Sequence, residues 1–140
     1  LGEPLAPVQA VTVCTRQFQN GTMLWRSGEA SGAIVALANP TGRFTLLDDT
    51  WDQRATPSCA PPGVPGLYLP DRGLGWAWCA NRSVRRGLGY STEPQEICDA
   101  AEHARVRDFR NGRITWVPSW NQVVCLPWDD ESWSAYNIVP

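Results

Sequence analysis

The string F-Q-N-G-T-M-L-W at residues 18–25 returns as F-R-N-G-R-I-T-W at residues 109–116, and this recurrence decides the fold. In both copies an Asn-Gly pair is followed by apolar residues at every second position, ending at the tryptophan. Asn-Gly supplies the positive backbone angles of a tight turn, and a period of two indicates a strand with one packed face. Each copy therefore predicts a turn followed by a strand.

Three further landmarks accompany each copy in the same order. They are an upstream Leu-Gly, a following apolar run and an acidic stretch that ends in Trp, at residues 1–2, 33–37 and 48–51 and again at 88–89, 123–126 and 129–133. Such ordered self-similarity indicates an internal duplication. With third strands at 44–47 and 134–138, each unit predicts a three-stranded antiparallel meander. One meander is too small to be stable alone, so we expect the two to pack face to face or to join.

We therefore expect a mainly β fold with short helices, built from two diverged repeats and stabilised by disulfides. The expected division is a first unit at 1–55, a Pro-rich connector at 56–72 and a second unit at 73–140, all within one compact domain. Each unit would open with a short helix or an extended segment, and residues 8–17 could be either.

Two helices are predicted in the second half of the chain. Thr92 and Gln95 form a capping box, and Ile97, Ala101 and Ala104 make a narrow apolar stripe beyond it. A second, short helix is expected at 84–89, ending at a glycine.

Five cysteines are spread widely along the chain, at positions 14, 59, 79, 98 and 125. This spacing is typical of a disulfide framework in an oxidising compartment, and the odd number leaves one thiol without a partner in the chain. We expect Cys59–Cys79 to close the Pro-rich segment and Cys98–Cys125 to join a helix to a strand, leaving Cys14 unpaired. Since no pair has C-x-x-C spacing and His103 is the only histidine, no metal site and no cofactor are expected.

Charge and hydropathy restrict the classes of partner. The net charge is −2, whereas sequence-independent binding to nucleic acid or to anionic membranes requires a basic surface. No apolar run approaches the roughly 18 residues of a membrane helix. We expect neither a nucleic-acid partner nor a transmembrane segment.

The repeated strings resemble the LGFP-type repeat of bacterial cell-envelope proteins, in which L-G-x-P precedes F-x-x-G-x-I-x-W and a G-A-x-x-V stretch. The chain is also similar to uncharacterised secreted bacterial proteins that carry R-G-[F/L]-G-x-x-W and V-R-x-x-L-G in tandem, patterns met at residues 72–78 and 84–89. The final Phe-Pro of the LGFP pattern is absent, and the second unit lacks the G-A stretch. The resemblance implies an extracellular or wall-associated module and carries over no catalytic residues. By the same resemblance, a V-R-type segment is expected upstream of Leu1.

Eight tryptophans are available for packing or for binding. Those that recur between the units (Trp25, Trp51, Trp116 and Trp133) are expected in the core. Those without a counterpart could form a platform on which sugar rings stack. The candidate ligand-binding residues are Trp76 and Trp78, which would share one face of an extended strand, with Tyr68, Trp120 and Trp128. The acidic pairs Asp48-Asp49 and Asp129-Asp130 are expected in solvated turns rather than in a calcium or catalytic site.

The leading hypothesis is a non-catalytic extracellular or cell-surface module that binds a glycan or another envelope component. The alternative is a structural subunit of a filament, sheath or surface complex, in which case homo-oligomers or polymers would bury free tryptophans and sheet edges. A glycoside hydrolase is the third possibility, but the sequence offers no convincing catalytic set.

Overall fold

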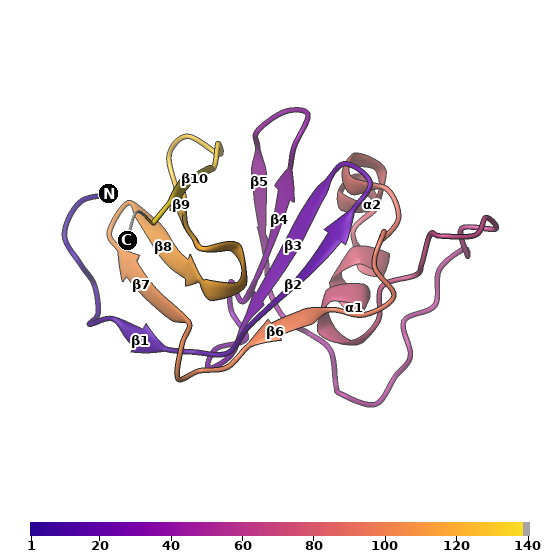
Figure 1. Ribbon diagram of the computed structural model, residues 1–140, viewed down its shortest axis with the longest axis horizontal. Coiled ribbons are helices and arrows are strands. Elements are labelled where there is room, and N and C mark those ends of the chain that lie inside the picture. The colour runs from indigo at the N-terminus through magenta and orange to yellow at the C-terminus, as the bar shows by residue number, and fades with distance from the viewer. Residues whose placement is uncertain (139–140) are drawn as a thin grey trace.

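The computed structural model describes residues 1–138 and has three layers (Figure 1). Two five-stranded antiparallel sheets pack against each other, and two helices lie on the side of one sheet that faces away from the other. The fold is mainly β with short helices and two disulfides, as the sequence predicts.

The two sheets contain the same kind of meander. Sheet B has the order β5 (Phe44–Leu47), β4 (Ile34–Ala38), β3 (Gly21–Arg26), β2 (Val13–Phe18) and β6 (Ile97–Asp99). Sheet A has the order β10 (Ser134–Asn137), β9 (Gln122–Pro127), β8 (Gly112–Val117), β7 (Arg105–Phe109) and β1 (Gln9–Ala10). Each meander has four strands rather than the predicted three, because the segment before each Asn-Gly turn is also a strand.

The recurring strings form the same hairpin in both sheets. Phe18 pairs with Gly21 as Phe109 pairs with Gly112, and the registers of both hairpins continue in step from there. The expectation that Asn-Gly supplies positive backbone angles is wrong, because neither pair has a positive φ. The glycines serve a different purpose: a Cβ on Gly21 would clash with the carbonyl oxygen of Leu37, and one on Gly112 with that of Leu126.

The fifth strand of each sheet comes from the other unit. β1 leads directly into β2 of sheet B, yet it pairs with β7 of sheet A. β6 leads into β7 of sheet A, yet it pairs with β2 of sheet B. The two leading segments therefore cross between the sheets, as the lower part of Figure 1 shows. The linear division at 1–55 and 73–140 does not capture this exchange.

The Leu-Gly motifs cross over in the same way. The amide of Asn20 donates to the carbonyl of Leu88 at 2.9 Å, and the amide of Asn111 donates to that of Leu1 at 2.9 Å. Gly2 and Gly89 both have a positive φ, at +84° and +74°. Each Leu-Gly thus binds the hairpin of the other unit. These matched contacts agree with two equivalent units, and the duplication itself stays a prediction.

Two hydrophobic cores hold the layers together. Between the sheets, side chains such as Val13, Leu24 and Val35 of sheet B meet Val106, Val124 and Leu126 of sheet A. Between sheet B and the helices, Met23 and Ile34 pack with residues of α1 (Arg72–Ala80) and α2 (Arg82–Leu88). A short 3-10 helix, η1, spans Pro118–Trp120.

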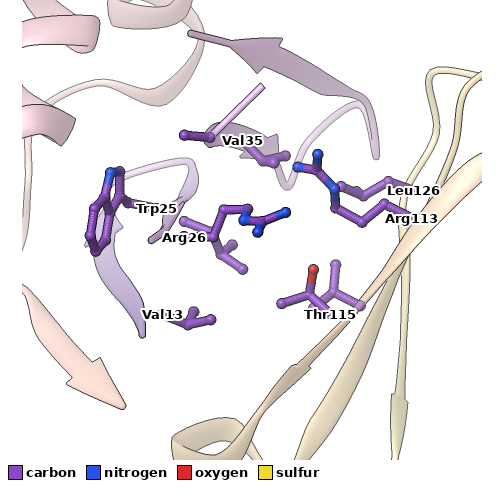
Figure 2. Close-up of a pocket in the computed structure, with 10 residues that line it drawn as sticks. Val13, Trp25, Arg26, Val35, Arg113, Thr115 and Leu126 are labelled. Atoms are coloured by element: carbon purple, nitrogen blue, oxygen red, sulfur yellow. The ribbon is translucent and has the colours of Figure 1, made fainter. Parts of the chain in front are cut away.

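A charged cluster lies between the two sheets (Figure 2). Arg26 of sheet B and Arg113 of sheet A are both buried and approach each other beside a cavity of about 10 Å³. Asp108 accepts from Nε of Arg113 at 2.7 Å, and its other oxygen lies 3.8 Å from Nη1 of Arg26. Burial, and then the charge of Arg113, lower the pKa of Arg26. Asp108 is therefore the shared counter-ion of two buried arginines.

The predicted helix after Thr92 is not formed, while the short helix ending at Gly89 is confirmed as α2. The segment that follows Ser91 is instead held against sheet B by Arg16, which donates to the hydroxyl of Ser91 at 2.7 Å and to the carbonyl of Glu93 at 2.9 Å. Residues 97–99 then pair with β2. Tertiary contacts have outweighed the local capping signal.

The strand crossing also decides one disulfide. Cys14 lies directly opposite Cys98 in the β2–β6 pair, and the two are bonded. Cys59 is bonded to Cys79, as expected. The expected Cys98–Cys125 bond and the unpaired Cys14 are wrong, since they assumed a helix where β6 forms. Cys125 is the free thiol and lies half-buried on β9.

Candidate functional site

A cleft of about 460 Å³ lies at the junction of sheet B, α1 and the loop after β5. We call it the tryptophan cleft. Its lining combines two indoles with acidic, basic and amide side chains and the Cys14–Cys98 disulfide: Thr12, Cys14, Trp25, Asp49, Trp51, Gln53, Arg72, Gly73, Leu74, Glu96 and Cys98.

One carboxylate positions both tryptophans of the cleft. Oδ2 of Asp49 accepts from the indole Nε1 of Trp25 at 2.9 Å, and Oδ1 accepts from the backbone amide of Trp51 at 3.2 Å. The indole Nε1 of Trp51 donates to the carbonyl of Ala55 at 2.7 Å. Since both ring N–H groups are satisfied within the protein, the rings present their apolar surfaces to the cleft.

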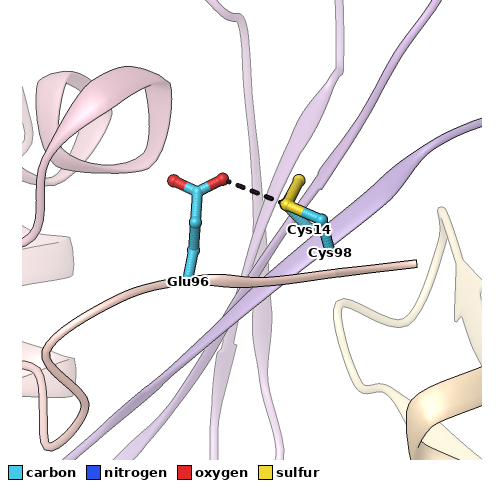
Figure 3. Close-up of side chains that lie close together, drawn as sticks. All are labelled: Cys14, Glu96 and Cys98. Carbon is cyan, nitrogen blue, oxygen red and sulfur yellow. Dashed lines mark hydrogen bonds between the residues drawn. A yellow bond between two sulfur atoms is a disulfide. The ribbon is translucent and has the colours of Figure 1, made fainter. Parts of the chain in front are cut away.

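Glu96 stands beside the disulfide (Figure 3). Its Oε2 lies 3.5 Å from Sγ of Cys98, and its Oε1 is buried without a hydrogen-bond partner among the described residues. Burial raises the pKa of Glu96, with Arg72 acting in the opposite direction. A disulfide sulfur carries no proton, so this contact is a hydrogen bond only when Glu96 is protonated.

Cys14, Glu96 and Cys98 are the group within residues 1–138 whose possible metal ligands lie close together. The chemistry does not fit, because cysteine binds metals as a thiolate and these two sulfurs are bonded to each other.

Two cleft residues have strained backbones. Gln53 has φ +67° and Arg72, the first residue of α1, has φ +57°. A non-glycine residue in this region costs of order 1–3 kcal/mol and is found preferentially at functional sites. The strain places an amide and a guanidinium on the cleft, where each can donate hydrogen bonds.

The residues predicted to bind ligand do not form one surface. Trp78 is 2% exposed and packs between Phe18 and Tyr90, with ring centroids 6.4 and 5.4 Å away. The expected strand at Trp76 and Trp78 is wrong, because these residues lie in α1, where positions two apart point in nearly opposite directions. Tyr68 is 37% exposed, and its backbone pairs with that of Ser91.

The remaining candidates lie in sheet A. Trp120 in η1 and Trp128 after β9 are half-buried and pack against the core between the sheets. Trp128 is also 5.6 Å from the guanidinium of Arg113 and 6.2 Å from the ring of Phe44. They have structural partners far from the tryptophan cleft.

The four recurring tryptophans, expected in the core, are all half-buried, and two of them, Trp25 and Trp133, pack against a hydrophobic core. Trp25 and Trp51 line the cleft, Trp116 lines a groove on sheet A, and Trp133 packs against the core between the sheets. Asp49, expected in a solvated turn, is half-buried, while Asp129 and Asp130 are in an exposed turn as predicted.

The cleft residues were not predicted as a binding site, although the sequence contains one signal. The string D-D-T-W at 48–51 places a carboxylate two residues before Trp51, and binding sites commonly combine aromatic side chains with a few polar groups. Arg72 and Glu96 could not be found from sequence, because they reach the cleft through α1 and through the exchanged strand β6.

Comparisons of this chain with protein-family models, with curated proteins and with solved structures gave no match. Among the described residues, the helices fall short of the length and apolar character required to cross a membrane.

Proposed function

We propose that this protein is a secreted, non-catalytic module that binds a carbohydrate in the tryptophan cleft. The observation that carries the proposal is the pairing of Trp25 and Trp51 around Asp49, with Gln53, Arg72 and Glu96 on the same cleft. Apolar sugar faces pack on indole rings, while carboxylate, amide and guanidinium groups hydrogen-bond the hydroxyls. The cleft provides both kinds of group.

The absence of a catalytic role is part of the proposal. Both oxygens of Asp49 already accept hydrogen bonds from the protein, from Trp25 and from the backbone of Trp51. A carboxylate used in this way positions side chains and is poorly suited to exchange protons with a substrate. Glu96 faces a disulfide, which makes it a support for the cleft wall rather than an acid in a catalytic pair.

The secreted location rests on two disulfides, which persist in oxidising compartments. The resemblance to LGFP-type repeats suggests a bacterial envelope component as the carbohydrate. A structural subunit of a surface assembly is the second candidate, favoured by the groove on sheet A and by the exposed side chains of Val8 and Tyr136.

The binding proposal is tested with glycan arrays displaying envelope polysaccharides and peptidoglycan fragments, followed by calorimetry on the positives. Trp51→Ala should lose at least about tenfold in affinity, since stacked aromatics commonly carry more than 1 kcal/mol of binding. Tyr68→Ala, at an exposed aromatic outside the cleft, is the matched control and should bind as the native protein does. Equal loss from both variants, or no binding to any array component, would overturn the proposal.

Arg72→Gly provides a sharper variant. Glycine relieves the positive φ, so the variant should be more stable by about 1 kcal/mol while losing the guanidinium from the cleft. Increased stability with weakened binding separates a role in recognition from a role in folding. If stability and binding rise together, Arg72 is not part of the recognition surface.

A further inference from the structure

Sheets A and B have outer faces with matching hairpin registers, and within residues 1–138 the helices cover that of sheet B alone. On the outer side of sheet B, Arg16 pairs with Met23 and Cys14 with Trp25. On sheet A, Arg107 pairs with Ile114 and Arg105 with Trp116. Phe18 and Phe109 hold the same place beside Gly21 and Gly112. We call these surfaces the covered face (sheet B) and the open face (sheet A).

Helices α1 and α2 bury the covered face. Leu74, Ala77 and Trp78 of α1 and Val84 and Leu88 of α2 pack on it, and its central residues Met23 and Ile34 are 0% exposed. In Figure 1 both helices lie on the far side of sheet B from sheet A.

The open face carries the same types of side chain without a cover. Ile114 and Trp116 stand where Met23 and Trp25 stand, but Ile114 is half-buried rather than buried. A groove of about 220 Å³ runs over this face, lined by Val8, Arg105, Val106, Arg107, Phe109, Ile114 and Trp116. Val8 in its lining is 54% exposed, and Tyr136, opposite Val123 on the same face, is 58% exposed. The groove thus offers apolar side chains, flanked by two arginines, that another segment of chain can contact.

Arg16 and Arg107, which hold equivalent positions on the two faces, differ in their acidic partners. Arg16 donates to the carbonyl of Glu93 and pairs at 2.8 Å with the carboxylate of Asp71, the residue that precedes α1. Arg107 donates to the carbonyl of Ala6 at 3.0 Å in the same manner. Among residues 1–138, however, no carboxylate lies within 4 Å of it. The acidic residue at the start of a covering helix is the partner that Arg107 lacks.

The Leu-Gly contacts show how a helix would reach this face. On the covered face α2 ends at Leu88, which enters the hairpin of sheet B. Leu1 makes the same contact with the hairpin of sheet A. A helical segment ending beside Leu1 would therefore lie over Ile114 and Trp116, as α1 and α2 lie over Met23 and Trp25.

We propose that the open face is a docking surface for a helical segment of the α1–α2 type. Its partner has an aspartate at the start of its first helix, which pairs with Arg107, and a Leu, Ala and Trp surface that packs on Phe109, Ile114 and Trp116. The proposal is independent of carbohydrate binding, because the tryptophan cleft lies on the other sheet.

The test fuses a second copy of residues 56–87 directly before Leu1 of the whole chain, so that the copied helices end where α2 ends before Leu88. Cys125, on the same side of sheet A as its strand partner Ile114, reports on docking through its alkylation rate in the native state. Docking should slow alkylation by at least about tenfold and raise the helical signal in circular dichroism. An unchanged rate and no added helix would contradict the proposal.

A matched control carries the copied Asp71→Asn and Leu74→Asp changes, which remove the ion pair and the apolar contact, and it should alkylate as fast as the unfused chain. Cys125 holds the position that the smaller Ala36 holds on the covered face, so its side chain can impede packing. A second fusion therefore carries Ile114→Met and Cys125→Ala. Its readout is the amide exchange rate of β8. If β8 exchange does not slow there either, the face does not accept such helices.

Light scattering on the unfused chain tests the competing occupant. If that chain is a dimer at tens of micromolar and Cys125 is already protected from alkylation, a second copy covers the face and the proposal is overturned.

Discussion

Sheets A and B have the same meander and matching hairpin registers, but their surroundings differ. Sheet B lies between sheet A and the helices, so residues on both of its faces are buried. The outer face of sheet A is less buried, since Ile114 there is half-buried where Met23 of sheet B is 0% exposed. Similar strand registers therefore do not decide whether a sheet is covered, because the cover of sheet B comes from α1 and α2, which lie outside its strands.

The largest effect expected from this comparison concerns the equivalent residues Met23 and Ile114. Met23→Ala removes a fully buried side chain and should destabilise the protein by about 3 kcal/mol. Ile114→Ala removes a half-buried one, and about 1 kcal/mol is expected. Urea unfolding of both variants measures the difference. Equal losses would mean that the open face is covered in solution.

The second prediction concerns the charges that join the two sheets. Asp108→Asn removes the counter-ion of Arg26 and Arg113, and because Asp108 is partly exposed the loss should be about 2–3 kcal/mol. Asp130→Asn, at an exposed turn, is the control and should change stability little. Should Asp108→Asn prove as stable as the native protein, the arginines must be neutralised by other groups.

The third prediction compares the two hairpin glycines. Gly21→Ala and Gly112→Ala each place a methyl group against a carbonyl oxygen of the next strand and against a leucine of the crossing Leu-Gly motif. Each should cost about 1–3 kcal/mol, with Gly21 the more sensitive because its contact is closer. Gly87→Ala in α2 meets no atom within 4 Å and should stabilise by up to about 1 kcal/mol. Thermal unfolding ranks the three variants, and tolerance of Gly21→Ala would show that the strands are further apart.

The smallest effect concerns Glu96, whose equivalent region in sheet A has no disulfide. The pKa of Glu96 is raised by burial, so the folded state binds its proton more tightly than the unfolded state does. Its contribution to stability is therefore complete at low pH and declines as pH rises through the raised pKa. Glu96→Gln cannot lose a proton, so its melting temperature relative to the native protein should increase from about pH 4 to pH 7. A constant difference across this range would show that Glu96 titrates normally.

The local patterns of the sequence predicted the parts of the fold that depend on neighbouring residues. The alternation before Trp25 and Trp116 gave the strands, and the glycine after Leu88 gave the end of α2. The segment of α1 was expected to be extended, with Trp76 and Trp78 on one face, and it is a helix. Gly75 lies within this helix because its backbone approaches Pro70 closely: a Cβ on Gly75 would clash with the carbonyl oxygen of Pro70.

The features that sequence reasoning missed depend on contacts between distant segments. The crossing of β1 and β6 joins residues of one unit to the sheet of the other, and no periodicity within a segment reports such an exchange. The Cys14–Cys98 bond and the place of Glu96 in the tryptophan cleft both follow from it. Prediction of the site therefore required prediction of the strand order.

Non-reducing peptide mapping by mass spectrometry, after brief alkylation of the native protein, tests the crossed arrangement most directly. The account predicts one linked pair containing Cys14 and Cys98, a second containing Cys59 and Cys79, and alkyl groups on Cys125 alone. A linked pair containing Cys98 and Cys125 would contradict it, because β6 could not then lie beside β2.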